Sequence, residues 1–194
     1  MLAAAYPRGC VRGRDEATAR HRADRLDRDQ ETPENIFGFF LQIVDDASYH
    51  AWHPEDHVAF RWIRGEPWQQ GSVVYAEEYI HGKLHKFKFF IKEVVPNRKI
   101  ELVPLSRLLR IYFPRNTLLI EPRNGSCVFT ASGVLRVGRL TKLLARNKLE
   151  QGLSSVRKHM KEEGENLKRL LEKRDSHNHA FHSDGNSDAL RSRR

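Results

Sequence analysis

Apolar and polar positions change their spacing twice along this chain, and each change marks a change of secondary structure. Between residues 33 and 53 the apolar positions recur three or four residues apart, which predicts helix. Through much of 58–138 they alternate with polar residues, as in HKFKFF, which predicts strands. The helical spacing returns from about 140 to 172. The predicted order is therefore two short helices, about six antiparallel strands and one long helix.

The two short helices carry recognisable end signals. Thr32 stands where an N-cap is expected, and Pro33 takes the first helical position before the apolar face of NIFGFFL. The second helix, within DDASYHAWHPEDH, is predicted to end before Pro54, because proline disfavours the helical conformation in the residue that precedes it.

The long last helix carries an apolar stripe that needs a surface to cover it. Glu163 falls inside this stripe and His159 at its edge, while Gly164 on the same side permits close approach of a neighbour. A curved antiparallel sheet wrapped around the helix would cover the stripe and leave a cavity, the usual place for an apolar ligand. The predicted fold class is α+β. The stripe consists of Leu149, Leu153, Val156, Met160, Leu167 and Leu171.

The length of 194 residues fits one domain with tails. Residues 1–32 lack hydrophobic periodicity, so we expect them to be a disordered or irregular extension, and 175–194 form a polar segment that we expect to be a disordered tail. The domain then spans 33–174. No apolar run approaches the ~18 residues of a membrane span, and the N-terminal segment lacks the apolar core of a secretory signal. We therefore expect a cytoplasmic protein.

Positive charge is the main compositional bias. The net charge is +9, and residues 33–174 hold 24 basic and 16 acidic residues, a net charge of +8. A basic domain can bind nucleic acid through phosphate contacts. Because these lysines and arginines are scattered over strands and helices, we rank nucleic acid last among the candidate partners.

Several classes of chemistry lack their sequence signals. Cys10 and Cys127 lie in very different contexts, so we expect two reduced thiols and no disulfide framework. There is no G-x-S-x-G motif and no glycine-rich phosphate loop of either common kind, which argues against nucleotide cofactors.

Three segments place ionisable side chains where the predicted architecture points inward. They are WHPEDH after the second helix, YAEEYIHG on a strand and RKHMKEEGE in the last helix. Neighbours on a strand face opposite sides, so only one of the two glutamates can face the cavity, and which of the two histidines in WHPEDH turns inward stays open. Imidazole and carboxylate groups bind zinc and similar divalent ions. The candidates are His53, His57, Glu77, Glu78, His159 and Glu163.

Each of these segments also has an ordinary explanation. A histidine and a glutamate four residues apart on a helix commonly form a local hydrogen bond or weak ion pair. Histidines at a helix end can cap it, and a strand carboxylate can be solvated. The hypothesis of a site therefore depends on all three segments meeting in one cavity.

Taken together, AWHPEDH, EEYIHGKLHKFKFFIKEVVPNRKIEL, IEPRNGSCVFTASG and RKHMKEEGENLKRLLE resemble the SRPBCC superfamily of START-like and polyketide cyclase-like proteins. The resemblance covers roughly 33–173, and the last helix is its most specific part. It implies the helix-grip fold, in which a seven-stranded antiparallel sheet grips the C-terminal helix around a cavity for a hydrophobic or aromatic small molecule.

Within that superfamily the sequence is similar to the diacetylphloroglucinol and phloretin hydrolases. These metal enzymes cleave a carbon–carbon bond next to a carbonyl with a His, Glu, His, Glu ligand set. The resemblance places that set at His57, Glu78, His159 and Glu163, with His53 and Glu77 as alternates. The gap of 21 residues between the first two is shorter than in those enzymes.

The N-terminal end departs from the helix-grip pattern. Such domains begin with a strand before the PENIF segment, yet residues 1–31 contain no strand-like stretch. The first strand is then missing, or this N-terminus is atypical. A missing strand would expose a sheet edge that invites pairing, so a homodimer is one candidate assembly.

Two functions from different classes follow. The first is a helix-grip protein that binds an apolar or aromatic carbonyl compound and, with Zn²⁺ or another divalent ion, hydrolyses it or acts as a cyclase. The second is a carrier or sensor in which the same histidines and glutamates only hydrogen-bond a ligand or one another.

Overall fold

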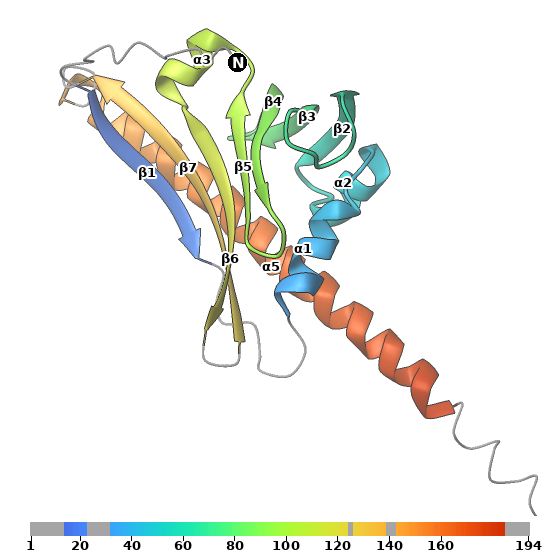
Figure 1. Ribbon diagram of the computed structural model, residues 1–194. Coiled ribbons are helices and arrows are strands. Elements are labelled where there is room, and N and C mark those ends of the chain that lie inside the picture. Colours follow the sequence, from blue (N-terminus) through green and yellow to red (C-terminus); the bar gives the residue numbers. More distant parts are fainter. Residues whose placement is uncertain (1–13, 23–31, 124–125, 139–142, 185–194) are drawn as a thin grey trace, which may run out of the picture.

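In the computed structural model an antiparallel sheet curves along one side of a single long helix (Figure 1). The structure describes residues 14–22, 32–123, 126–138 and 143–184, and it describes side chains for 32–122, 127–138 and 143–174. In chain order the elements are β1 (Arg14–Arg22), α1 (Pro33–Leu41), α2 (Asp46–Trp52), β2 (His57–Arg64), β3 (Val73–Ile80), β4 (Lys83–Val95), β5 (Lys99–Pro104), α3 (Arg107–Tyr112), β6 (Arg115–Arg123), β7 (Ser126–Gly138) and α5 (Arg146–Asp184).

The described strands form one seven-stranded sheet in the order β1-β7-β6-β5-β4-β3-β2, and every neighbouring pair is antiparallel. Apart from β1, each strand pairs with the next along the chain. The fold is therefore the predicted helix-grip fold.

Of the two alternatives for the N-terminal end, the missing first strand was wrong. β1 pairs with β7 from Arg14 opposite Gly138 to Arg22 opposite Thr130, within the segment expected to be irregular. Main-chain hydrogen bonds to the edge of β7 can hold a strand whose own sequence shows no alternation, and for this reason the pattern did not reveal it.

The two short helices lie where the sequence predicted them. The Thr32 side chain accepts a hydrogen bond from the Asn35 amide at 3.2 Å and caps α1, with Pro33 in its first turn. Asp45 caps α2, which ends at Trp52 before Pro54. Both helices pack against α5, so the first two helices and the last helix meet.

Part of the stretch 58–138, where the sequence pattern predicted strands, is helical. The segment LLRIYFPRNTLLIEPRNG contributes to α3 before β6 begins at Arg115. The Ser106 side chain caps α3 by accepting from the Leu109 amide at 3.3 Å, and Phe113, before Pro114, leaves the helical conformation.

The last helix is longer than expected at its C-terminal end. α5 runs ten residues beyond 174 to Asp184, into the segment expected to be a disordered tail. Extending an existing helix costs far less than starting one, so polar residues can continue it. Leu153, Leu167 and Leu171 of the predicted stripe are buried, as expected.

The core lies between the inner face of the sheet and the helices. It includes Phe40 of α1, Ile91 and Ile100 of the sheet, and Phe129 of β7, all almost completely buried. Cys127 is a buried thiol in β7, whereas Cys10 lies outside the described residues. Among the described helices, none is both long and apolar enough to cross a membrane.

Candidate metal centre

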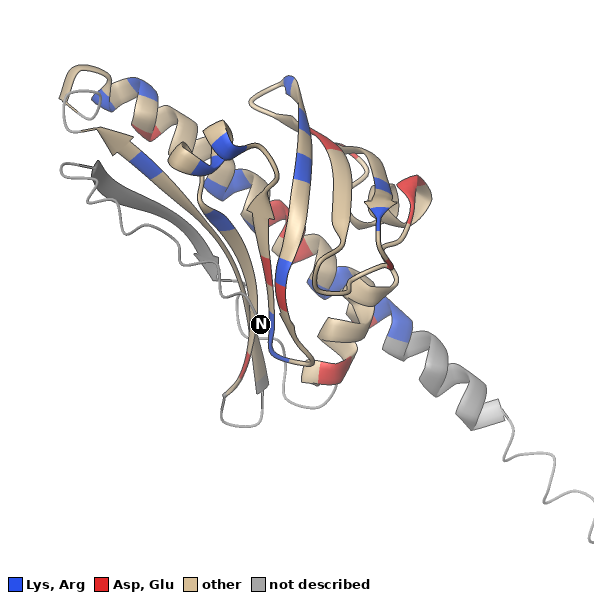
Figure 2. Ribbon diagram, turned by 45° about the horizontal axis from the view of Figure 1, so that its top comes forward, with Lys and Arg blue, Asp and Glu red and all other residues tan. Residues whose placement is uncertain are grey.

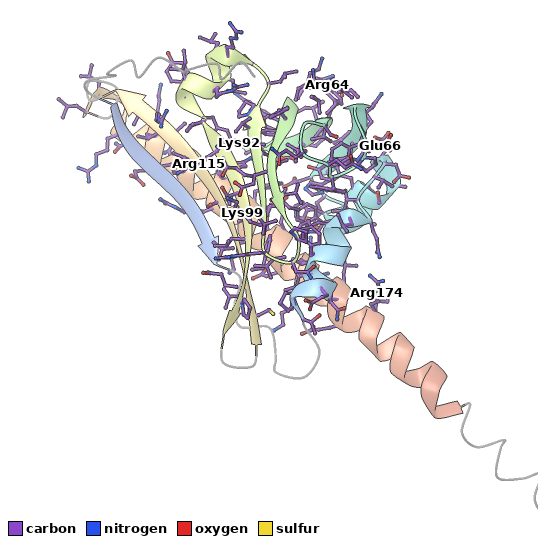
Figure 3. All side chains as sticks on the ribbon, viewed as in Figure 1. Arg64, Glu66, Lys92, Lys99, Arg115 and Arg174 are labelled. Carbon is purple, nitrogen blue, oxygen red and sulfur yellow. The ribbon has the colours of Figure 1, made fainter. Side chains whose placement is uncertain are left out.

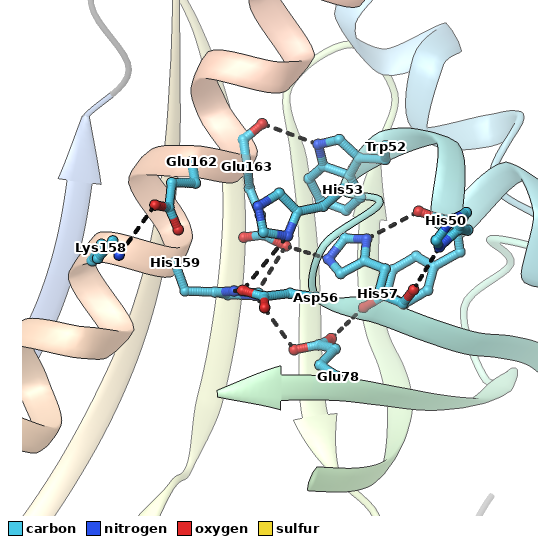
Figure 4. A network of polar contacts seen from close by, with 11 residues as sticks. His50, Trp52, His53, Asp56, His57, Glu78, Lys158, His159, Glu162 and Glu163 are labelled. Atoms are coloured by element: carbon cyan, nitrogen blue, oxygen red, sulfur yellow. Dashed lines mark hydrogen bonds and ion pairs between the residues drawn. The ribbon is translucent and has the colours of Figure 1, made fainter. Parts of the chain in front are cut away.

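A short turn after α2 brings the first group of candidate residues together. The backbone amides of Asp56 and His57 both donate to the carbonyl oxygen of His53, at 3.3 and 2.9 Å. This turn ends α2 and starts β2 at His57. His53, Asp56 and His57 therefore lie side by side where α2, β2 and α5 meet (Figure 4).

His57 is fully buried and has both ring nitrogens engaged. Its Nδ1 lies 3.0 Å from the Tyr49 carbonyl oxygen, which can only accept, so Nδ1 carries the proton. Its Nε2 lies 3.1 Å from Oε1 of Glu163. The ring also stacks on Tyr49 with centroids 3.7 Å apart, which fixes its plane.

His159 reaches the same place from α5. Its Nδ1 lies 2.9 Å from Oδ2 of Asp56, and its Nε2 lies 3.6 Å from Oε2 of Glu78 and 3.7 Å from Oε1 of Glu163. Nε2 is buried and makes no hydrogen bond among the described residues. It is thus a buried polar atom facing two carboxylates across ion-pair distances.

The two neighbouring glutamates of β3 face opposite sides of the sheet, as the strand pattern requires. Glu78 faces the histidines and accepts a hydrogen bond from the Tyr49 hydroxyl. Glu77 instead accepts from the Tyr75 hydroxyl and pairs with Lys86 at 3.3 Å. The structure therefore brings Glu78, and not Glu77, to the histidines.

A hydrogen bond between α2 and α5 also helps to position Glu163. The indole nitrogen of Trp52 donates to the backbone carbonyl of Glu163 at 3.0 Å (Figure 4). The next residue, Gly164, is buried on the side that the sequence predicted for close packing. This contact holds the Glu163 backbone against the end of α2.

The histidine–glutamate cluster, defined as His57, Glu78, His159 and Glu163, has the chemistry that a divalent ion needs. Both histidines direct Nδ1 to an outer acceptor, the arrangement that orients metal-binding imidazoles in other proteins. Ligands ~2.1 Å from a tetrahedral zinc ion lie ~3.4 Å apart. The separations of 3.1, 3.6 and 3.7 Å within the cluster are close to that spacing. His57, His159 and Glu163 all lie close enough to one another to hold one ion, and Glu78 adjoins this group through His159.

The electrostatics of the metal-free cluster favour charged groups despite burial. Burial lowers the pKa of His159, but the carboxylates of Glu78, Glu163 and Asp56 outweigh it and raise that pKa to about 10. Burial would raise the pKa of Glu78, but the nearby histidines and the Tyr49 hydroxyl lower it overall. At neutral pH a proton therefore occupies Nε2 of His159, the atom that a metal ion would need.

The Tyr49 hydroxyl stays protonated in this setting. Its burial, together with the charges of Glu78 and Glu163, raises the pKa of Tyr49 well above 10.0. The phenol therefore acts as a hydrogen-bond donor to Glu78 and holds that carboxylate in place.

His53, the alternate to His57, occupies a different position. It is buried, and its Nδ1 lies 3.7 Å from Oδ2 of Asp56 with no hydrogen-bond partner among the described residues. Burial and the neighbouring histidines lower the pKa of His53. His53, Asp56 and His159 also come close enough to hold an ion, but that grouping leaves out both glutamates of the histidine–glutamate cluster.

Sequence reasoning missed two residues of this site, Asp56 and Tyr49. Asp56 lies within WHPEDH, between two candidate histidines, and its carboxylate was a usable signal. Tyr49 lies eight residues before His57 on α2, and no spacing in the sequence indicates that its carbonyl and hydroxyl would contact two different members of the cluster.

Two more buried polar atoms lie on the β2–β4 part of the sheet. The Nε2 of His85 and the indole nitrogen of Trp62 make no hydrogen bond among the described residues. His85 pairs with Glu78 in the β3–β4 ladder, so the two side chains share one face. Phe87 and Phe89 continue that face, with His85 stacked on Phe87 at 5.9 Å.

Comparison with known proteins identifies the fold. No protein-family model and no curated protein matches the sequence. Truncated norcoclaurine synthase from Thalictrum flavum is similar in structure with a TM-score of 0.60 and 11% identity, over 82% of this chain and 95% of that one. The KanY protein (ms6282) is similar with a TM-score of 0.58 and 10% identity, over 81% of this chain and 99% of that one. Ara h 8.0201 is similar with a TM-score of 0.54 and 10% identity, over 83% of this chain and 99% of that one.

At this level of identity the similarity shows a shared fold and nothing finer. The shared fold is the helix-grip fold, as the sequence predicted.

Proposed function

We propose that this protein is a divalent-metal-dependent hydrolase that cleaves a carbon–carbon bond next to the carbonyl of an apolar or aromatic compound. The observation that carries the proposal is the convergence of two imidazole Nε2 atoms and two carboxylates from β2, β3 and α5. Buried ionisable groups are costly unless they are paired or bind a metal.

His57, Glu78, His159 and Glu163 would hold the ion, and Tyr49 and Asp56 would fix the orientation of these ligands. A bound divalent ion supplies a polarised carbonyl oxygen or a water molecule of lowered pKa. Hydrolysis then adds water across the scissile bond: the acyl carbon takes the hydroxyl group and the ring carbon takes the proton.

The ligand is expected to lie along the sheet face next to Glu78. Phe87 and Phe89 offer aromatic surface, and both are at least partly buried. The Nε2 of His85 and the indole nitrogen of Trp62, which make no hydrogen bond within the described part of the chain, offer two polar contacts to oxygen atoms of the ligand. An aromatic ring that carries hydroxyl and acyl groups matches this combination of surfaces.

Metal content tests the proposal directly. The full chain should be prepared with His177, His179 and His182 replaced by Gln, so that these histidines do not contribute, and dialysed against Zn²⁺ or Mn²⁺. We expect about one bound ion per chain. The ion should be lost in a His159→Gln, Glu163→Gln variant and retained in Glu77→Gln, which changes the opposite face of β3.

An acyl-phenol hydrolysis assay then separates enzyme from carrier. Metal-dependent release of the carboxylic acid supports the hydrolase. A protein that stays metal-free after dialysis, yet co-purifies with an apolar compound detected by mass spectrometry, would support a carrier instead.

A further inference from the structure

The end of the sheet that carries α3 exposes large apolar side chains. Leu108 is 68% exposed, and Leu143 and Leu144, after the end of β7, are 76% and 83% exposed. These are the most exposed large apolar side chains among the described residues. None of the residues of α3 is buried.

These leucines lie at one end of the molecule. β6 starts at Arg115, directly after α3, and Arg115 pairs with Val134 of β7, four residues before β7 ends. The segment after β7 leads into α5 at the same end of the sheet (Figure 1). We call Leu108, Leu143, Leu144, Arg107 and Lys148 the basic apolar end.

The two stretches of sequence that lead to and from this end are basic, although Arg139 and Lys142 within them lie outside the described residues. Segments 104–120 and 134–149 contain eight lysines and arginines and no acidic residue. The rest of 33–174 is balanced, with 16 basic and 16 acidic residues. Figure 2 shows basic positions on α3 and on the first turns of α5.

Some basic residues elsewhere on the sheet are paired with a carboxylate. Lys92 and Lys99, on β4 and β5, pair with Glu101 at 2.6 and 3.7 Å (Figure 3). On α3, by contrast, the Arg110 guanidinium donates to the carbonyl oxygens of Pro104 and Leu105, which leaves its charge uncompensated by a carboxylate in those contacts.

We propose that the basic apolar end binds the surface of an anionic lipid membrane. Exposed leucines next to lysine and arginine are the combination that inserts into the headgroup region while pairing with lipid phosphates. The phosphates of a nucleic acid would pair with the basic side chains but would not cover three exposed leucines. A symmetric dimer through this end would bring two positive surfaces face to face, which charge repulsion disfavours.

Vesicle co-sedimentation of the full chain tests this surface. Vesicles of phosphatidylcholine alone should bind weakly, and those mixed with phosphatidylglycerol should bind strongly and less so in high salt. Leu108→Gln, Leu143→Gln, Leu144→Gln should lower the partition coefficient at least about tenfold. The matched control is Leu41→Gln, Val44→Gln, Ile63→Gln, which removes partly exposed apolar groups elsewhere.

A charge variant provides a second, independent test. Arg107→Gln, Lys148→Gln should weaken binding about fivefold per charge, while Arg98→Gln, Lys173→Gln should have little effect because those exposed residues lie outside the basic apolar end. Circular dichroism confirms that each variant is folded.

Three results would overturn the proposal. The first is equal binding by the leucine variant and its control. The second is salt-sensitive binding to duplex DNA, without vesicle binding, that the leucine variant retains. The third is a dimer in sedimentation velocity that dissociates in the leucine variant.

Discussion

The histidine–glutamate cluster buries ionisable groups between β2, β3 and α5, whereas the basic apolar end leaves leucines in solvent. In the cluster, each side chain is held by neighbours from other elements, as His159 is by Asp56 and Glu78. At the basic apolar end, Leu143 and Leu144 are 76% and 83% exposed. Buried polar groups are thus accounted for by their contacts within the fold, whereas a group of exposed apolar side chains indicates a binding partner outside it.

Removing a carboxylate from the cluster should lower the free energy of unfolding more than the other changes below. Glu78→Ala leaves the His159 charge buried with one carboxylate fewer, so we expect the metal-free protein to lose ~3–5 kcal/mol of unfolding free energy. Glu77→Ala, on the other face of β3, should cost much less. Urea denaturation of both variants measures these losses. Equal losses would contradict a stabilising role for the contacts between Glu78 and the histidines.

The metal affinity of the cluster should depend steeply on pH. The pKa of His159 is about 10 without metal, so binding must displace a proton from its Nε2. We expect zinc affinity to rise about tenfold per pH unit from about pH 7 to about pH 9. Competition with a chelator at several pH values measures this slope, and a flat profile would place the metal elsewhere.

The same proton sets the pH dependence of the metal-free fold. Because the pKa of His159 is raised from 6.5 to about 10 on folding, its ion pairs stabilise the protein fully below pH 6.5. That stabilisation is lost progressively as the pH rises through 10. Denaturation midpoints of wild type and His159→Gln should converge over this range.

Substitution of Asp56 tests the outer hydrogen bond of His159 while leaving all four cluster residues in place. Asp56→Asn keeps an oxygen that can accept from Nδ1 of His159 but removes the carboxylate charge. We expect zinc affinity to fall 10- to 100-fold, the range typical of outer partners of metal-binding histidines, in titrations at fixed pH. Glu55→Gln, an exposed neighbour, is the control and should not alter affinity.

The smallest effect is expected at the basic apolar end. Leu108→Gln, Leu143→Gln, Leu144→Gln should change stability by less than ~0.5 kcal/mol, as surface substitutions do. In contrast, Leu167→Ala removes a side chain that is 1% exposed and should cost ~2–5 kcal/mol. Thermal and urea unfolding compare the two, and a large loss in the triple variant would mean that those leucines pack within the fold.

Most of the architecture followed from local patterns. Capping by Thr32, the stop before Pro54 and the stripe of α5 were all predicted, because helix ends and buried faces leave marks in sequence. β1 and α3 were not predicted. β1 depends on the backbone edge of β7, and α3 depends on a cap at Ser106 within a run of residues that also suits a strand.

The site was predictable only in part. The sequence marked His57, Glu78, His159 and Glu163, and the structure brings all four together. Asp56 and Tyr49 contact the cluster through the geometry of one turn and one helix, which no periodicity encodes. Their roles follow from packing between elements, and such packing is a property of the assembled fold.

The contact between His57 and Glu163 spans 106 residues of chain. At a synthesis rate of ~5–20 residues per second, α5 emerges several seconds after the strands that it must meet. During that interval the nascent sheet carries His57 and Glu78 without their partners from the last helix. Completion of the cluster is thus a late event in biogenesis, and metal loading would report that the whole domain has closed.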